Sequence, residues 1–314
     1  YDPKPAIGIS KDELAFQAAN DIIKTYLEVA RLNEPGIIAD LDTEFLHDYR
    51  VSLRKIRSVI SLFKGVYSDQ QTATLKQAFS DLMSPTGRLR DLDVYLLDRD
   101  SYFRLLPDSL HDGLSIMFGV LENERHEQLG ILSTHLKDPA YDETMNSLND
   151  LFSDATRLEA GANADLSAYL YARELIWKRY RKVCKTARAI HPDTPDSEVH
   201  QLRIHCKKLR YLMEFFSPMF PAREFKRLLK ALKVLQDNLG LFNDYSVQQD
   251  FLQDFISTHG MKGREQDIST AKSVGALIAI LHQKQLDERA RVISNFETFD
   301  SPAIQQKFQK LFKL

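Results

Sequence analysis

The sequence predicts an all-α protein, and three observations carry that prediction. Apolar residues recur at intervals of three and four along almost all of the 314 residues, which is the period of an amphipathic helix. No stretch shows the alternation of apolar and polar residues that a half-buried strand requires. The 12 Gly and 11 Pro residues fall mainly between the periodic segments. Because the loops between these segments are short, we expect antiparallel helical bundles.

Cap residues set the expected helix boundaries in the first half of the chain. A capping box from Ser10 to Glu13 predicts the start of a long helix that ends near Glu34-Pro35-Gly36. A second capping box, from Ser68 to Gln71, predicts a helix that stops at 84–87. Three other helices of this half are expected at about 43–65, 108–136 and 140–159, and a fourth is expected to begin at about 89.

The second half repeats this order of elements. The run Gly161-Ala162-Asn163-Ala164 is the expected junction, so the predicted halves are residues 1–160 and 161–314. Thr194 and Pro195 predict the cap and the first position of a helix. Asn238-Leu239-Gly240 predicts a turn. Other helices are expected at about 165–190, 242–258, 267–297 and 302–313, and one more is expected to begin at about 221.

Eighteen residues occur twice at a fixed offset of 153, at 46–63 and at 199–216. Most of the non-identical pairs exchange one apolar residue for another. The register continues without a gap to Gly87/Gly240 and Asp91/Asp244. A shared period of this length indicates an ancient duplication, so the two halves should fold alike. The five identical pairs are His47/His200, Arg50/Arg203, Lys55/Lys208, Arg57/Arg210 and Phe63/Phe216.

Composition excludes some classes of protein and locates the charge. No apolar run approaches the 18 residues of a membrane span, so no membrane association is expected. Cys184 and Cys206 lie 22 residues apart without a CxxC motif, which is typical of free thiols in a reducing, cytoplasmic compartment. The net charge is only −2, yet residues 47–64 carry +4 and residues 200–216 carry +3. Positive charge is therefore concentrated in the repeated segments, on an otherwise acidic protein.

Each repeated segment places its cations in one stripe along a helix. At about 100° per residue, the His and three cations of each copy fall within roughly 80°, and the other Lys lies to the side. The apolar residues of the same helices, such as Leu53 and Phe63 or Leu209 and Phe216, form the opposite, core-facing stripe. We name the basic sets the first ladder and the second ladder. They consist of His47, Arg50, Arg54, Lys55 and Arg57, and of His200, Arg203, Lys207, Lys208 and Arg210.

Two such ladders indicate an anion-binding function, against the alternative of solvated helix faces. Solvated faces normally mix signs, and neither stripe carries an acid. Basic side chains at successive turns repeat every ~5 to 6 Å, which suits neighbouring phosphates of a linear polyanion. His47 and His200 could each donate a ring N–H to phosphate; the alternative is a histidine satisfied by neighbouring backbone.

Two further basic clusters have no counterpart in the other half. One is the dense run from Trp177 to Lys182, and the other is a line of lysines before the expected turn. Asp91 and Asp93 resemble a metal pair, but Asp93 becomes Ser246 in the repeat, so no metal site is predicted. The rim contacts expected from the two clusters, with solvated surface as the alternative, are Lys178, Arg181, Lys226, Lys230 and Lys233.

Catalytic motifs are scarce. His205-Cys206 followed by Arg210 has the wrong spacing for a cysteine phosphatase, which also requires a loop at this point. The sequence contains no HExxH, Walker or GxSxG motif. The ladders offer no carboxylates to hold the Mg²⁺ that phosphoryl transfer normally uses. Binding without turnover, with no cofactor, is therefore expected.

The doubled His-x-x-Arg-x-x-x-basic-basic-x-Arg pattern, with the segments from Gly87 and Gly240, resembles the CHAD domain family over nearly the whole chain. The resemblance implies two antiparallel four-helix bundles, related by a pseudo-two-fold axis, around a central basic pore that binds inorganic polyphosphate. It implies that both ladders line this pore. Arg88 and Arg90 become Leu241 and Asn243 in the second half and are therefore doubtful ligands.

The same resemblance implies an association with cytoplasmic polyphosphate granules and a CYTH-type triphosphate-tunnel enzyme as a partner. Two alternatives stay open, which are binding of a nucleic-acid phosphate backbone and an enzyme that degrades polyphosphate. Nucleic acid is disfavoured because aromatic residues do not interleave with the ladders as stacking platforms.

Overall fold

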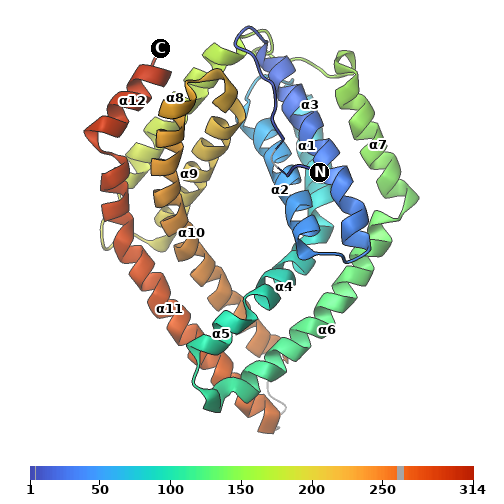
Figure 1. Cartoon of the computed structure of the whole chain (residues 1–314), viewed down its shortest axis with the longest axis vertical. Helices are drawn as coiled ribbons and strands as arrows, with labels where there is room; N and C mark the ends of the chain where they lie inside the picture. The colour runs from blue at the N-terminus through green and yellow to red at the C-terminus, as the bar shows by residue number, and fades with distance from the viewer. Residues whose placement is uncertain (4, 260–264) are drawn as a thin grey trace.

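The computed structural model describes residues 1–3, 5–259 and 265–314, which form helices joined by short connections (Figure 1). These residues contain no strand, and their isolated bridges join Leu14 with Ser167 and Tyr67 with Ala160. The prediction of an all-α fold is confirmed. No helix among these residues has the length and apolar character needed to cross a bilayer.

The helices follow the order expected from the sequence. The first half contains α1 (Ala15–Ile38), α2 (Thr43–Leu62), α3 (Asp69–Met83), α4 (Gly87–Leu97), α5 (Arg99–Leu105), α6 (His111–Leu136) and α7 (Pro139–Ser153). The second half contains α8 (Ala168–Arg188), α9 (Asp196–Phe216), α10 (Ala222–His259), α11 (Glu265–Phe299) and α12 (Pro302–Phe312). The starts of α1, α2 and α3 lie 153 residues before those of α8, α9 and α10, which is the offset of the sequence repeat.

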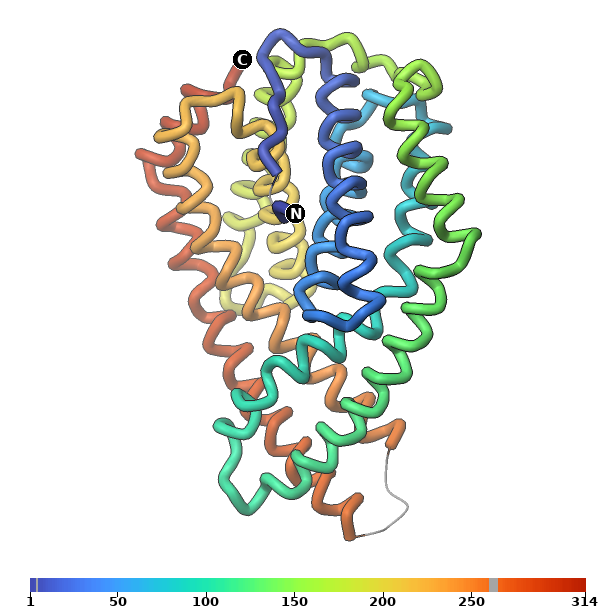
Figure 2. The backbone as a smooth tube through the Cα atoms, turned by 45° about the vertical axis from the view of Figure 1, so that its right-hand side comes forward, coloured from blue at the N-terminus to red at the C-terminus, as the bar shows by residue number. Residues whose placement is uncertain are grey.

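Two hydrophobic clusters hold the helices together, and each draws residues from both halves. The larger one joins the α1–α2 side to the α8–α9 side through residues such as Leu53 and Leu209. The smaller one joins Phe118 of α6 to Leu252 of α10 and Leu277 of α11. Figures 1 and 2 show this second meeting point at the end of the molecule farthest from the chain termini. The long helices of the second half thus complete a core with the first half.

Equivalent positions of the two repeats touch one another. The bridge between Leu14 and Ser167 joins residues 153 apart, at the caps of α1 and α8. Phe63, at the end of α2, stacks on Phe216, at the end of α9, with ring centroids 4.9 Å apart. A residue can meet its own equivalent only close to a two-fold axis, so these are contacts that the expected pseudo-two-fold axis would produce.

The turn expected at Asn238-Leu239-Gly240 is wrong, because α10 runs unbroken through it. The amide of Asn238 is buried and donates to the carbonyl and a carboxylate oxygen of Glu288 in α11, at 2.9 and 2.7 Å. The equivalent position in the first half is Pro85, which lies in the 3₁₀ turn that separates α3 from α4. Pro85 has no N–H for a helical hydrogen bond, whereas Asn238 keeps its own and also bonds to α11, which favours an unbroken helix in the second half.

Helix α1 differs from the expectation at both ends. Ser10 N–H donates to the Glu13 carboxylate as a capping box requires, yet the helix begins only at Ala15. At its other end α1 continues through Pro35 to Ile38. Gly36 is needed there because the Phe45 ring packs so closely that a Cβ would lie 2.3 Å from it. The proline-glycine pair therefore permits helix packing here and does not end the helix.

Smaller differences concern α7 and α9. Helix α7 ends at Ser153, before the expected 159, and Pro195 caps α9, which begins at Asp196. Both ends of α3 were predicted more closely. Ser68 accepts from Gln71 N–H at the start of α3, and that helix ends at Met83 before the 3₁₀ turn.

Candidate functional site

The two ladders lie on α2 and α9, which contact each other across the halves. Arg54 and Lys207, which occupy the same repeat position, lie close enough for their charges to interact. Burial, followed by the charges of Arg203 and Arg54, lowers the pKa of Lys207 to about 8. A cation of the first ladder therefore acts on a cation of the second, as expected for stripes that face each other.

A cavity of about 770 Å³ lies between the two halves and is lined by three residues of the first ladder and by one of the second, Arg210. Its other walls include Tyr26 of α1, Gln236 of α10, the N-terminal prolines and the acidic residues Glu44, Asp48 and Glu214. The structure thus brings together four of the predicted residues from distant parts of the sequence, which are His47, Arg54, Lys55 and Arg210.

Arg50 and Arg203 occupy equivalent positions with different surroundings. Arg50 donates to the hydroxyl of Thr86, which the 3₁₀ turn between α3 and α4 places beside α2. Burial and the charges of Arg54 and Arg90 lower the Arg50 pKa. At the position of Thr86 the second half has Leu239, which has no hydroxyl. Arg203 therefore lacks the equivalent hydrogen bond.

Three arginines of this region hold buried N–H groups that no described residue accepts. They are Nε of Arg54, Nε of Arg203 and Nη1 of Arg90. Buried donors in folded proteins are almost always paired, so a cluster of such groups requires an explanation. Their grouping on α2, α9 and α4 indicates a site for a ligand that accepts hydrogen bonds and carries negative charge.

Arg90 and Arg88, which the sequence left in doubt, differ in the structure. Arg90 lies close enough to His47 and Arg50 for its charge to lower both of their pKa values. It is a site cation that comparison of the repeats set aside, because Asn243 stands at its position in the second half. Arg88 instead forms two hydrogen bonds with the Glu124 carboxylate, and its charge is neutralised there.

The two ladder histidines have different partners. His200 is exposed, and its Nδ1 lies 2.9 Å from Oδ1 of Asn243. His47 is half-buried; burial, Arg90 and Arg54 lower its pKa, while Glu44 and Asp48 oppose the shift. His47 is therefore neutral near pH 7 and can either donate or accept a hydrogen bond.

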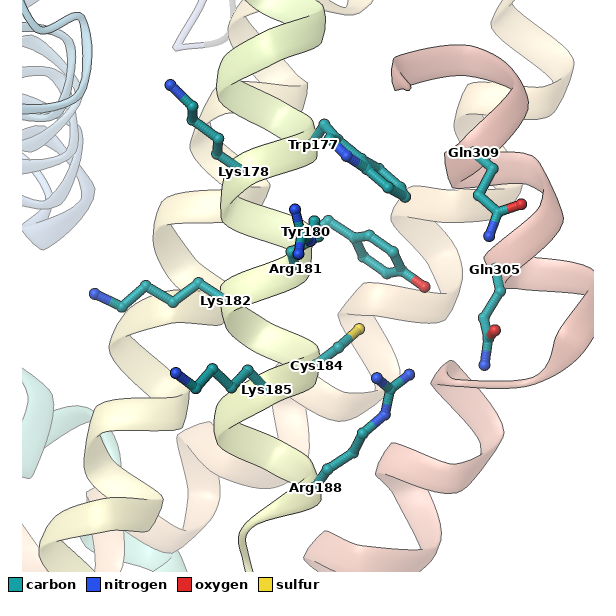
Figure 3. Close-up of a pocket in the computed structure, with 10 residues that line it drawn as sticks. All are labelled: Trp177, Lys178, Tyr180, Arg181, Lys182, Cys184, Lys185, Arg188, Gln305 and Gln309. Atoms are coloured by element: carbon teal, nitrogen blue, oxygen red, sulfur yellow. The ribbon is translucent and has the colours of Figure 1, made fainter. Parts of the chain in front are cut away.

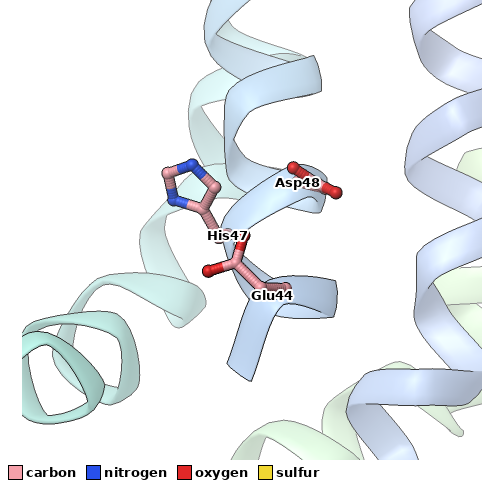
Figure 4. A group of neighbouring side chains, drawn as sticks. All are labelled: Glu44, His47 and Asp48. Carbon is pink, nitrogen blue, oxygen red and sulfur yellow. The ribbon is translucent and has the colours of Figure 1, made fainter. Parts of the chain in front are cut away.

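Glu44, His47 and Asp48 form a group in the first two turns of α2, and their ligand atoms all lie within 4.8 Å of one another (Figure 4). Two carboxylates and one imidazole could hold a divalent cation. The N-terminus of α2 stabilises Glu44 without a metal, and Asp48 accepts from the Tyr1 hydroxyl at 2.7 Å. The group is thus accounted for by interactions within the protein.

The paired lysines of the ladders also differ. Lys55 is buried and donates to the Tyr26 hydroxyl at 2.8 Å. The residue equivalent to Tyr26 in the second half is Arg179, whose Nη1 lies 3.4 Å from Nδ1 of His205. Burial, followed by the charges of Arg179, Lys182 and Lys64, lowers the pKa of Lys208. The sequence singled out the basic run from Trp177 to Lys182 but predicted rim contacts only for Lys178 and Arg181, so Arg179 was not expected beside Lys208.

The remaining predicted residues are partly engaged elsewhere. Arg210 donates to Glu214 at 2.6 Å, and Arg57 is half-buried on α2. Lys178 pairs with Glu174, and Lys233 lies 3.8 Å from Asp237. The expected rim residues are exposed, and none of them lines the cavity between the ladders, namely Lys178, Arg181, Lys226, Lys230 and Lys233. Their contact with ligand remains a prediction.

Comparison with known proteins decides the family. A family model described as the CHAD domain matches residues 21–253, nearly three quarters of the chain. The chain belongs to the CHAD domain family. The match includes both ladders and Arg90, so every residue that carries the site lies within the part of the chain that defines the family.

Solved structures show the same fold beyond the matched range. The crystal structure of the CHAD domain from the plant Ricinus communis is 24% identical, with a TM-score of 0.73, and covers 98% of this chain and 96% of that one. PptA from Streptomyces chartreusis is 15% identical, with a TM-score of 0.62, and covers 94% and 99%. A comparison with curated proteins gave no match. The CHAD fold therefore extends over α11 and α12 as well.

Proposed function

We propose that this CHAD domain binds inorganic polyphosphate between α2 and α9 without hydrolysing it. The observation that carries the proposal is the group of unpaired, buried guanidinium N–H donors of Arg54, Arg90 and Arg203. Phosphoryl oxygens accept strong, charge-assisted hydrogen bonds from such donors. A phosphate chain at this place would satisfy the donors and neutralise the repulsion among the ladder cations.

The arrangement of cations favours a chain over a single phosphate. The first ladder extends from His47 to Arg57, about 15 Å along α2. The second ladder contributes its own row from α9, and the charges of the two rows act on each other at Lys207. A ligand that matches two rows must carry negative charge repeated along its length. Polyphosphate carries about one charge per phosphate and needs no base or sugar recognition.

The test measures the binding of polyphosphates of graded length at several salt concentrations. We expect affinity to rise with chain length until the ladders are filled. It should fall steeply with salt, because cations on the protein release the counterions of the polyanion. The paired change Arg50→Ala with Arg203→Ala should weaken binding at least about tenfold and make the salt dependence shallower. Arg99→Ala on α5, where Arg99 pairs with Glu122, is the matched control.

Two other functions are separated by further arms of the same test. RNA or DNA that displaces polyphosphate at equal phosphate concentration would favour a nucleic-acid-binding function. Release of phosphate with Mg²⁺ or Mn²⁺ would favour a degrading enzyme. Unchanged affinity in the Arg50 and Arg203 double variant would reject the ladders as the binding site.

Location and partners follow from the family resemblance alone. We expect the protein to associate with cytoplasmic polyphosphate granules and to act together with a CYTH-type triphosphate-tunnel enzyme. Fluorescence microscopy of the wild-type protein and of the Arg50 and Arg203 double variant tests the first expectation. Only the wild-type protein should collect on granules.

A further inference from the structure

A second basic groove lies between α8 and α12 and contains none of the ladder residues (Figure 3). Its volume is about 640 Å³. Trp177, Tyr180 and Arg188 of α8 face it, and Gln305 and Gln309 of α12 lie opposite. The polyphosphate proposal uses none of its aromatic residues and expects only rim contacts at Lys178 and Arg181.

The floor of the groove is aromatic and held in place by the core. Tyr180 is buried and stacks on Phe308 of α12, with ring centroids 3.9 Å apart. Trp177 is only partly buried and lies 5.6 Å from Tyr180, between ring centroids. An indole fixed in this way is a preformed platform on which a planar ring can stack without much loss of side-chain freedom.

The walls of the groove are cationic. Two of its cations are paired, Lys178 with Glu174 and Arg188 with Asp300. Arg181 and Lys185 have no acidic partner in the described part of the chain, and no acid lines the groove. Arg181 lies one helical turn from Trp177, and Lys185 lies one turn farther on, at the open edge of the groove, with its side chain directed away from α12 (Figure 3). Each step is about 6 Å.

The aromatic floor decides which anion fits. The face of an aromatic ring carries partial negative charge, so it repels phosphate oxygens and favours a planar, apolar group. The phosphate must therefore lie beside Arg181 and Lys185 while another part of the ligand covers Trp177. The Gln309 side chain makes no hydrogen bond to the described residues, and its amide can pair with the edge of such a ring.

We infer that this groove binds a nucleoside phosphate, with the base on Trp177 and the phosphates at Arg181 and Lys185. The ligand is either a free nucleotide or the phosphorylated end of a single strand, which present the same chemistry. The site is separate from the ladders and does not depend on the polyphosphate proposal.

Trp177 is the only tryptophan of the chain, so its fluorescence reports on this groove directly. Titration with ATP should quench it saturably, because a stacked base quenches an indole. Tripolyphosphate, which has similar charge and no base, should bind at this groove at least about tenfold more weakly. A 5′-phosphorylated uridine oligonucleotide tests the strand as the source of the ligand.

Variants test whether ATP binds at this groove or at the ladders. Arg181→Ala with Lys185→Ala should raise the ATP dissociation constant about tenfold. Trp177→Ala should also raise the ATP dissociation constant about tenfold, measured by calorimetry. Trp177→Phe keeps an aromatic face and should retain most of the affinity for ATP. Arg50→Ala with Arg203→Ala should leave ATP binding within about twofold and weaken polyphosphate binding.

Three results would overturn the inference. The first is that ATP does not quench the fluorescence of the folded wild-type protein saturably. The second is that ATP and tripolyphosphate bind with equal affinity at Trp177. The third is that the Arg50 and Arg203 double variant no longer binds ATP. Circular dichroism of each variant confirms folding. Because polyphosphate binding is measured in the same variants, failure here and failure of the polyphosphate proposal are distinguishable.

Discussion

Phe63 stacks on Phe216 with ring planes 14° apart, and the two residues hold the same position in the two copies of the repeat. Both side chains are almost fully buried, at the C-terminal ends of α2 and α9. The ladders begin about four helical turns earlier on the same helices. The stack therefore fixes the rotation of the two ladder-bearing helices relative to each other.

Phe63→Ala should lower the free energy of unfolding by about 3–5 kcal/mol, because it leaves a cavity against Phe216 in a packed core. Urea denaturation measures the loss. Leu97→Ala, at a position 61% exposed, is the control and should change stability by less than about 0.5 kcal/mol. A loss below about 1 kcal/mol for Phe63→Ala would mean that the stack does not hold the halves together.

Arg54→Leu should weaken polyphosphate binding while leaving the free energy of unfolding unchanged or higher. The change removes a buried, unpaired N–H donor and a charge that opposes that of Lys207. Leu53→Ala, one residue away and fully buried, should instead cost about 2–5 kcal/mol. Unfolding and binding measured on the same samples separate the two effects. Strong destabilisation by Arg54→Leu would show that this arginine has a structural role.

Polyphosphate affinity should fall about tenfold between pH 7 and pH 9 because Lys207 loses its proton. In the protein without ligand, burial and the charges of Arg203 and Arg54 lower the pKa of Lys207 to about 8, and a bound phosphate would raise this pKa. Binding therefore takes up a proton above pH 8, which weakens it as the pH rises. Lys207→Arg should bind with little pH dependence over this range, since arginine stays charged. The same fall in Lys207→Arg would assign the titration to another group.

The two halves should contribute unequally, and exchanging one pair of residues tests this. Arg179→Tyr copies Tyr26 into the second half and removes a cation near Lys208. It should weaken polyphosphate binding and make the logarithmic salt dependence shallower by about 0.7. Tyr26→Arg is the reciprocal change beside the cavity between the ladders, and it should strengthen binding. If Arg179→Tyr and Tyr26→Arg both weakened or both strengthened polyphosphate binding, the unequal contribution of the halves would not be electrostatic.

The sequence predicted well what a single helix specifies. Three- and four-residue periodicity placed Leu53, Phe63, Leu209 and Phe216 in the core, and all four are buried. Cys184 and Cys206 are buried free thiols, as expected from their spacing. Helical geometry also placed His47 and Arg54 on one stripe, and the structure puts both beside the same cavity. Local periodicity was sufficient for these residues.

Tertiary contacts decided what the sequence did not predict. Asn238 lies inside a helix because Glu288, 50 residues away, accepts its hydrogen bonds. Arg90 joins the site because α4 brings it next to His47, although its repeat position holds Asn243. Arg88, only two residues away, is neutralised by Glu124. No pattern within one helix contains this information.

The unbroken α10 has a consequence for how a ligand reaches the ladders. With 38 residues it is a rod about 57 Å long that extends from the α8–α9 side into the cluster with α6 and α11. The bridge between Leu14 and Ser167 ties the halves elsewhere, so they cannot swing apart like a clamshell without breaking a core. Under the proposed function a phosphate chain then binds without a hinge motion of the two halves.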